Sequence, residues 1–294
     1  MRAAFVIVAT FFVGGALARE SAVAQAPIAR ERASHMDPAS DAASAPLVVY
    51  AAGSLTGALA DIAKRYTAAT GEPIRVVNGP AGLLRERIEK GEPADVYISA
   101  NMAHPETLAA KGKATLPVVF ARNALCVTTL PDAGITSANL LDRLLAPGVK
   151  IGTSTPGADP GGDYAWQFFA HAETVRTGAR ANLEAKAKKL VGGPVPPVIP
   201  GNIGAAKYFL QHRDVDVFFG YCSSHDATPD PDLRKVPVPE NLALPVDYGM
   251  SVILRDGGPA RRAAAYRFAL YAMSPAAQER LPAYGFRAVA APER

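Results

Sequence analysis

The chain has 294 residues, of which 49% are hydrophobic and 20% charged, and its formal net charge is +4. This composition is typical of a globular protein and excludes a collagen-like or wholly disordered chain. The basic residues form no cluster interleaved with aromatic residues, so nucleic acid is not an expected partner. The length suits two domains or one unit with two lobes.

The N-terminus has the pattern of a secretory signal peptide. Met1 and Arg2 form a short positive region, and the apolar stretch at 3–18 ends in small residues. We predict a signal peptide over residues 1–26, cleaved on export to the periplasm. The alternative is an uncleaved membrane anchor, for which the stretch is short, and no cysteine follows it to carry a lipid. Residues 27–45 are rich in Ala, Ser, Pro and Asp, which predicts a flexible leader.

The folded part is expected to begin with a strand and a helix. Leu47–Ala52 is an apolar run with β-branched and aromatic residues, and Gly53 marks a turn after it. Apolar residues then recur at helical spacing until Gly71, which is a stop signal. Ser54 lies where the strand meets the helix, so we predict that it is the N-cap. A helix start of this kind presents free N–H groups and a positive dipole end, which favour anions.

Strands and helices continue to alternate after this pair. We predict strands at 74–77 and 95–100, helices at 83–90 and 102–111, and two strands within 116–130. The short connections are typical of an α/β sheet with right-handed crossovers. We assign 46–121 to the first part of lobe 1 and 122–240 to lobe 2, and we expect 241–294 to return to lobe 1.

The second half of the chain predicts further strands and helices. The strands are expected at 150–154, 215–221, 233–238 and 249–254, and the helices at 137–145, 164–171, 179–190, 203–211, 260–273 and after 274–275. We interpret the strands at 233–238 and 249–254 as returning to the first lobe. The segments 155–163 and 192–201 are rich in glycine or proline, which predicts loops.

Several helix starts consist of small residues. Three strand-to-helix turns, at 53–54, 80–82 and 160–162, contain Gly, Ser or Ala, and a fourth helix start lies at 202–203. In an open α/β sheet such turns emerge at the carboxyl ends of the strands, where ligands bind. Two facing lobes would gather neutral N–H and O–H donors around one point. The pattern predicts a cleft site for a small anion or polar ligand, although each turn alone also has an ordinary structural explanation.

The chain has two cysteines, Cys126 and Cys222. In an oxidising compartment they could form a disulfide, but two cysteines in predicted strands are also ordinary core residues. A CxxC pair and neighbouring histidines are both missing from the sequence around them. The cysteines therefore indicate no metal site.

Two motifs are specific enough to indicate a family. Residues 50–55 read YAAGSL, and residues 91–100 read GEPADVYISA. They resemble the A-A-x-S-L-T turn and the G-x-P-A-D strand of periplasmic molybdate-binding proteins of ABC transporters. The ending at 274–275 and 284–286 is also similar, so the resemblance covers about 47–286. It implies an α/β, two-lobed class II binding protein with a tetrahedral oxyanion held in the interlobe cleft by neutral hydrogen bonds, an ABC permease as partner, and no cofactor.

The resemblance also implies a set of ligand-binding residues. Ser54 matches a family serine whose hydroxyl and N–H bind oxygen. Ala81 falls on a second family serine, so that only its N–H remains as a donor. Gly161 and Ile203 fall on backbone donors, and Tyr221 matches a tyrosine whose hydroxyl donates to the anion.

Three departures from the family pattern bear on the ligand. The lost serine hydroxyl at Ala81 removes a donor worth about 1.5–3 kcal/mol to a charged ligand. Asp159 and Asp163 flank the third turn and would repel an anion if they faced the cleft, and the segment 221–226 is unusual for the family. Molybdate, with tungstate of the same charge and nearly the same size, is one expected ligand. A sulfate-like anion or a small organic acid is the alternative.

The organic acid and an enzyme would each need particular side chains. A carboxylate ligand calls for an arginine fork, for which Arg85 and Arg122 are candidates. An enzyme would need a nucleophile–base pair, for which Ser54 could be combined with a histidine. The histidines in question are His104, His171, His212 and His225. The Gly-x-Ser-x-Gly motif is absent, so we predict a solute-binding protein and not an enzyme. We also expect the protein to be a monomer.

Overall fold

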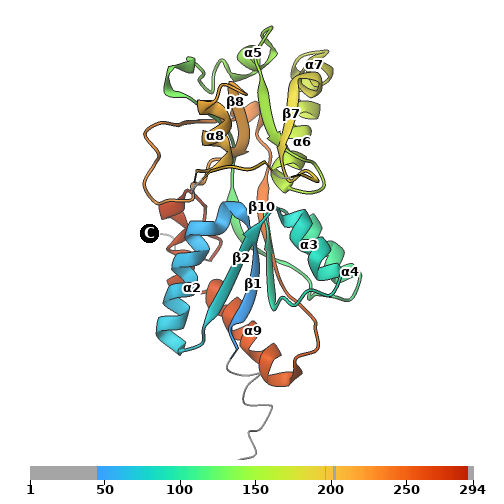
Figure 1. Cartoon of the computed structure of the whole chain (residues 1–294), viewed down its shortest axis with the longest axis vertical. Coiled ribbons are helices and arrows are strands. Elements are labelled where there is room, and N and C mark those ends of the chain that lie inside the picture. The colour runs from blue at the N-terminus through green and yellow to red at the C-terminus, as the bar shows by residue number, and fades with distance from the viewer. Residues whose placement is uncertain (1–44, 196, 201–202, 291–294) are drawn as a thin grey trace, which may run out of the picture. The chain divides into compact units, whose positions relative to one another are not determined.

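The computed structural model describes residues 45–195, 197–200 and 203–290 (Figure 1). The predicted signal peptide at 1–26 lies outside these residues, as does the predicted leader at 27–45 except for Ala45. None of the helices in the described part combines the length and the hydropathy that a membrane span requires.

The first lobe is built on a five-stranded sheet with the order β2-β1-β3-β10-β4. Its strands are β1 (Leu47–Ala52), β2 (Ile74–Gly79), β3 (Val96–Ser99), β4 (Val118–Asn123) and β10 (Val246–Val252). Strand β1 runs parallel to β2 and β3, whereas β10 is antiparallel to β3 and β4. A strand from late in the chain therefore lies inside this sheet.

Helices cover both faces of the first sheet. They are α2 (Thr56–Thr70), α3 (Ala81–Glu89), α4 (Ala103–Ala110), α9 (Gly258–Ala272) and α10 (Pro275–Gln278), with 3-10 turns η1 (Gly53–Leu55) and η4 (Leu281–Tyr284). Right-handed crossovers in this strand order place α2 and α3 on opposite faces, as Figure 1 shows. Tyr66 of α2 packs edge-on against Phe268 of α9, with ring centroids 5.2 Å apart. The predicted end of α2 at Gly71, in left-handed conformation, is confirmed.

The second lobe has its own five-stranded sheet with the order β7-β6-β8-β5-β9. Its strands are β5 (Leu125–Thr129), β6 (Ile151–Ser154), β7 (Ala187–Val191), β8 (Val217–Tyr221) and β9 (Arg234–Pro237). The chain passes from the first sheet to the second at Ala124, between β4 and β5. It returns between β9 and β10.

The helices of the second lobe pack on this sheet. They are α5 (Leu140–Leu145), α6 (Pro160–Val175), α7 (Ala179–Lys186) and α8 (Ala205–Gln211), with 3-10 turns η2 (Pro131–Ala133) and η3 (Glu240–Leu242). Phe168 and Phe169 of α6 contact Phe219 of β8, with ring centroids 5.1 and 5.5 Å apart. This aromatic cluster fixes α6 over the end of β8.

The predicted loop at 155–163 is partly wrong, because α6 begins at Pro160 and takes in the two glycines. Proline suits the first helical position because its φ is already helical. Asp159 caps the helix, and its carboxyl accepts the N–H of Gly161 at 2.9 Å. Gly162 is required by close packing, since a Cβ there would lie 2.5 Å from the carbonyl oxygen of Ser154. Gly162 therefore marks a tight contact and not a loop.

Two further expectations are wrong. The helix predicted at 179–190 ends at Lys186, and its last residues form β7, an edge strand that exposes Lys188 and Lys189. The lysines favour a helix by propensity, but pairing with β6 overrides it. The strand predicted at 233–238 does not return to the first lobe, because β9 pairs with β5 in the second sheet. Only β10 returns.

Candidate anion-binding site

The two lobes meet at the starts of two helices. The first turn of α3 follows β2, and the segment 155–159 leads from β6 into α6. The N–H of Leu83 donates to the carbonyl oxygen of Ala158 at 3.3 Å. A Cβ on Gly82 would lie only 2.2 Å from the carbonyl oxygen of Gly157. Predicted turns from different lobes therefore lie against each other.

Ser54 is not the N-cap of α2, contrary to the prediction. It is the middle residue of η1, and Leu55 is the N-cap of α2. The 3-10 turn makes its own closing contact, since Thr56 Oγ1 donates to the carbonyl oxygen of Gly53 at 2.7 Å. The Ser54 hydroxyl is therefore free of capping, and its oxygen lies 2.8 Å from Tyr248 Oη of β10.

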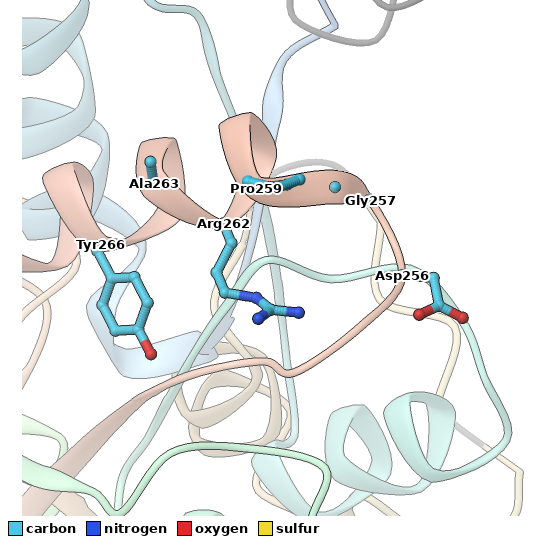
Figure 2. A pocket seen from close by; sticks show the side chains of 7 residues that line it. Asp256, Gly257, Pro259, Arg262, Ala263 and Tyr266 are labelled. Atoms are coloured by element: carbon cyan, nitrogen blue, oxygen red, sulfur yellow. The ribbon is translucent and has the colours of Figure 1, made fainter. Parts of the chain in front are cut away.

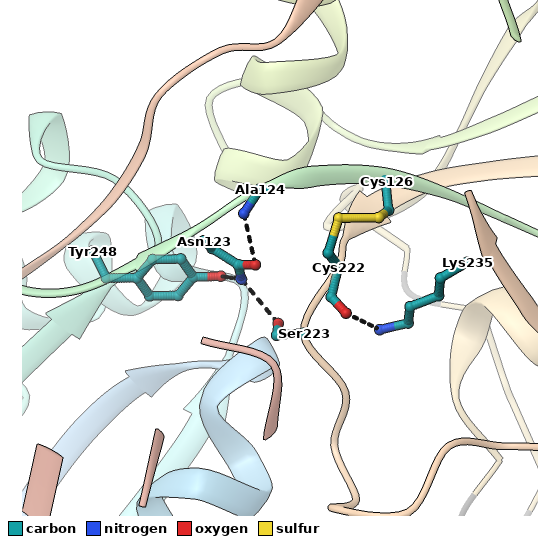
Figure 3. The surroundings of a disulfide bond; sticks show 7 residues. All are labelled: Asn123, Ala124, Cys126, Cys222, Ser223, Lys235 and Tyr248. Carbon is teal, nitrogen blue, oxygen red and sulfur yellow. Dashed lines mark hydrogen bonds between the residues drawn. A yellow bond between two sulfur atoms is a disulfide. The ribbon is translucent and has the colours of Figure 1, made fainter. Parts of the chain in front are cut away.

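A buried polar network extends from Tyr248 (Figure 3). Asn123 Nδ2 donates to Tyr248 Oη at 3.2 Å and to Ser223 Oγ at 2.9 Å. Burial raises the pKa of Tyr248 above its usual value, so this residue is a neutral hydroxyl at physiological pH. Asn123 and Tyr248 were not predicted as site residues. Only the pairing of β10 with β4 brings them together.

Tyr221, at the end of β8, lies among other aromatic side chains. Its ring packs edge-on against Tyr164 of α6 at 6.2 Å and against Tyr248 at 5.7 Å. Its hydroxyl oxygen is buried and has no hydrogen-bond partner among the described residues. Burial, together with the nearby tyrosines and acidic groups, raises the pKa of Tyr221 well above 10, so the hydroxyl is a neutral donor. An unpartnered buried hydroxyl is costly, and a ligand oxygen would satisfy it.

The start of α6 already holds a carboxylate. The predicted donor, the N–H of Gly161, is bonded to Oδ1 of Asp159. Burial raises the pKa of Asp159, Gly161 and Ser154 lower it, and Asp163 raises it further. Asp163 Oδ1 accepts the N–H of Gly157 at 2.7 Å, and burial likewise raises the pKa of Asp163. Both acidic side chains are therefore turned toward backbone N–H groups around this helix start.

The other two predicted residues have different surroundings. Ala81 is buried and is the first residue of α3, and its carbonyl oxygen accepts the hydroxyl of Tyr97 at 2.6 Å. The next two residues, Gly82 and Leu83, make the contact with the second lobe. Ile203 precedes α8 by two residues and is 41% exposed. Among the described residues, no hydrogen bond joins Ile203 to the other predicted site residues.

Both candidate arginines lie beside a carboxylate. Arg122 of β4 is half exposed and pairs with Asp247 at 3.3 Å. Arg85 of α3 lies 3.5 Å from Glu89 and 3.4 Å from His104 Nδ1. Burial and Arg85 lower the pKa of His104 to about 4, so that imidazole is neutral.

A surface hollow lies at the start of α9 in the first lobe (Figure 2). It is lined by Asp256, Gly257, Gly258, Pro259, Arg262, Ala263 and Tyr266. None of the predicted site residues lines it.

In the part of the chain that the structure describes, no group of three or more His, Cys, Asp or Glu side chains could hold a metal ion.

Cys126 of β5 and Cys222, directly after Tyr221, form a disulfide (Figure 3). The N–H of Cys222 donates to the carbonyl oxygen of Ala124 at 2.9 Å, and Lys235 Nζ donates to the carbonyl oxygen of Cys222 at 3.2 Å. Burial lowers the pKa of Lys235 to about 8. These contacts fix the chain next to Tyr221 at the crossing between the sheets.

Two α/β lobes joined by crossing strands, with polar groups gathered at helix starts between them, define the architecture of a two-lobed solute-binding protein. Residues 47–287 match the family described as bacterial extracellular solute-binding protein. The chain therefore belongs to this family.

Relatives and solved structures agree with this assignment. The chain is 35% identical to the uncharacterized protein PM1146 of Pasteurella multocida over 62% of this chain and 77% of that protein. It is 26% identical to the molybdate-binding protein ModA of Haemophilus influenzae over 84% and 92% of the two chains. The resemblance inferred from the motifs is thereby confirmed.

Solved structures share the fold. The periplasmic molybdate-binding protein of Azotobacter vinelandii is 21% identical, with a TM-score of 0.65 over 82% of this chain and 98% of that one. The sulfate-binding protein SubI of Mycobacterium tuberculosis is 16% identical, with a TM-score of 0.66 over 83% and 87%. At these identities the likeness shows the fold, which confirms the predicted fold class.

Proposed function

We propose that this protein captures molybdate, and tungstate with it, between its lobes and delivers it to an ABC permease. The observation that carries the proposal is the buried hydroxyl of Tyr221, which has no partner among the described residues. It lies beside Tyr248, whose hydroxyl contacts Ser54 of the opposite turn. A ligand with acceptor oxygens would satisfy Tyr221 and reach Ser54 without any charged side chain.

The chemistry of the neighbouring groups suits a small oxyanion. Hydroxyls and backbone N–H groups at helix starts bind anions through hydrogen bonds and the positive end of the helix dipole. The 26% identity to the molybdate-binding relative in H. influenzae, over 84% of this chain, adds a second line of support. As proposed ligand-binding residues we retain Ser54, Ala81, Gly161, Ile203 and Tyr221.

Export to the periplasm and function as a monomer complete the proposal. The disulfide between Cys126 and Cys222 suits an oxidising compartment. A predicted signal peptide at 1–26 would direct the chain there, and a permease in the inner membrane would receive the ligand. A monomer is sufficient because both lobes of the site come from one chain.

Another oxyanion or a small organic anion is the second candidate ligand. The observation that favours it is the pair of acidic side chains, Asp159 and Asp163, at the start of α6. Ala81 also lacks the hydroxyl that the molybdate-binding pattern has at this position. Selectivity is therefore the property to measure.

The decisive experiment is a titration of the purified chain, without its predicted signal peptide, with molybdate, tungstate, sulfate and phosphate. A ligand at 100 times its dissociation constant adds about 2.7 kcal/mol to the free energy of unfolding. We expect stabilisation by molybdate and tungstate. No binding of molybdate or tungstate would reject the proposed ligand, and a response to sulfate or phosphate alone would establish the second candidate.

The variant Tyr221→Phe tests the role of the unpartnered hydroxyl. We expect molybdate affinity to fall about 10- to 100-fold, as for a hydrogen bond to a charged group. The free energy of unfolding without ligand should not fall, because the hydroxyl has no protein partner to lose. Tyr266→Phe, on the 40% exposed Tyr266 of α9, is the matched control and should leave affinity unchanged.

A further inference from the structure

We propose that the carboxyl group of Asp159 competes with the oxyanion for the N–H of Gly161. Binding then requires one proton to be shared between this carboxyl group and a ligand oxygen. This inference rests on the proposed function and concerns the same site. It assigns to Asp159 the role of a specificity-determining residue.

The competition follows from the geometry at the start of α6. Oδ1 of Asp159 accepts the N–H of Gly161 at 2.9 Å. That N–H is the donor expected to bind the anion. The helix has 16 residues and directs its positive end to this point. The carboxylate therefore occupies the place of an anionic ligand.

Tyr221 independently indicates that a ligand binds here. Its hydroxyl is buried without a partner in the described part of the chain, and its ring faces Tyr164 in the first turns of α6. Asp159 is among the groups that raise the pKa of Tyr221, after burial and Tyr248. Asp159 accepts the N–H of Gly161 at the start of α6, but the Tyr221 hydroxyl remains without a partner among the described residues. The Tyr221 hydroxyl therefore needs a separate acceptor.

The charges around Asp159 make a second anion costly. The titratable groups whose pKa is coupled to that of Asp159 by charge are Asp163 of α6, Tyr97 of β3, Tyr221 of β8 and Tyr248 of β10. None of these is a cation, and Ser154 beside it is neutral. Arg85 acts on Asp163. Two full negative charges on Asp159 and the ligand would therefore repel each other, because none of these described neighbours of Asp159 supplies a compensating positive charge.

One shared proton removes this repulsion. Molybdate and sulfate carry no proton at neutral pH, so Asp159 must take one from solvent and then donate a hydrogen bond to a ligand oxygen. Hydrogen phosphate or a phosphate monoester that keeps a proton can instead donate to the carboxylate. Raising the pH should thus weaken the binding of molybdate and sulfate but not that of hydrogen phosphate.

Calorimetric titration at pH 7, 8 and 9 with molybdate, sulfate and phosphate tests the proposal. Titrations in buffers of different ionisation enthalpy count the protons taken up. For the unmodified chain we expect uptake of about one proton per molybdate and an affinity that falls close to tenfold per pH unit. In Asp159→Asn the uptake and the pH dependence should both disappear, and molybdate should bind more tightly at pH 9.

The variants can be compared because asparagine caps helices as well as aspartate does. Asp216→Asn is the matched control, since Asp216 also accepts a backbone N–H in the second lobe, from Lys150 at 2.8 Å. It should keep the full pH dependence of molybdate binding.

Two results would overturn the inference alone: molybdate binding without proton uptake, or an unchanged pH dependence in Asp159→Asn. Both leave the proposed function intact, because molybdate still binds. Failure of every oxyanion to bind both the unmodified chain and Asp159→Asn at all three pH values would instead reject the proposed function, and this inference with it.

Discussion

Ser54 Oγ and Tyr248 Oη lie 2.8 Å apart although 194 residues separate them in the sequence. Tyr248 also accepts a hydrogen bond from Asn123. A tyrosine hydroxyl that accepts from Asn123 can donate its own proton to Ser54, which leaves the Ser54 proton for a ligand oxygen. Strand β10, which returns from the second lobe, thus orients Ser54 through the Tyr248 hydroxyl.

Tyr248→Phe should therefore weaken oxyanion binding although Tyr248 need not touch the ligand. We expect a loss of about 2- to 10-fold in affinity, the range of one ordinary hydrogen bond, and a lower free energy of unfolding because Asn123 loses a partner. Titration calorimetry and urea unfolding measure the two effects. Tyr66→Phe, which removes a hydroxyl bonded to Glu72, should lower stability alone. Equal affinity in both variants would contradict this orienting role.

Gly82→Ala should prevent the lobes from meeting. The new Cβ would lie 2.2 Å from the carbonyl oxygen of Gly157 and 2.7 Å from that of Ala158, both in the other lobe. Within α3, alanine in place of glycine favours the helix by up to about 1 kcal/mol, so the first lobe should fold at least as well. We expect more than tenfold weaker binding, seen by calorimetry, and a larger radius of gyration by X-ray scattering. Gly204→Ala, whose new Cβ would have no atom of the described residues within 4 Å, should behave like the unmodified chain.

Asp95→Asn should lower the stability of the first lobe. It should also reduce the loss of free energy of unfolding on acidification. The buried carboxyl pairs with Arg261 at 2.6 Å and Arg255 at 3.0 Å and accepts the N–H of Val48 at 2.7 Å. Burial alone would raise the pKa of Asp95, but these partners lower it below its usual 3.8. Its stabilising contribution is therefore complete above that pH and is lost as the pH falls through the folded-state pKa.

The expected cost of Asp95→Asn at pH 7 is about 3 kcal/mol, because two arginines lose their anion. Urea unfolding between pH 2.5 and 7 should show a smaller loss of stability on acidification than in the unmodified chain. Asp142→Asn breaks the exposed pair with Arg176 and should cost less than about 1 kcal/mol. Similar costs for both variants would contradict the importance of burial at Asp95.

Reduction of the disulfide should lower stability strongly. The bond joins residues 96 positions apart, and closing a loop of that length restricts the unfolded chain by about 4.7 kcal/mol. Unfolding in urea with and without dithiothreitol measures the difference. A double variant, Cys126→Ser with Cys222→Ser, should show the reduced stability in both conditions and no response to the reductant.

Much of the fold could be predicted from local patterns. The buried strand β1 and the helix that ends at Gly71 have clear apolar periodicity and a clear stop signal, and both are present. The sheet to which β9 belongs could not be predicted, because a four-residue strand carries no information about its partner. The lysines of β7 likewise favour a helix until pairing with β6 decides otherwise.

The site was predictable where motifs mark it and not where tertiary contacts build it. Ser54 comes shortly after β1 and Tyr221 is the last residue of β8, so their positions could be anticipated. Tyr248 and Asn123 lie within strands whose pairing connects distant segments, and nothing in their local sequence sets them apart. Asp159 was predicted as a charge near the third turn, but its bond to Gly161 depends on where α6 begins.

The position of β10 inside the first sheet also constrains the order of folding. Residues 125–237 supply every strand of the second sheet and both cysteines, so that lobe can fold and oxidise while the rest of the chain is still emerging. The first sheet cannot join β3 to β4 until residues 246–252 arrive between them. A chain that emerges from its N-terminus must therefore keep β1, β2 and β3 unaggregated until its last quarter appears, because the edge of β3 stays unpaired until then.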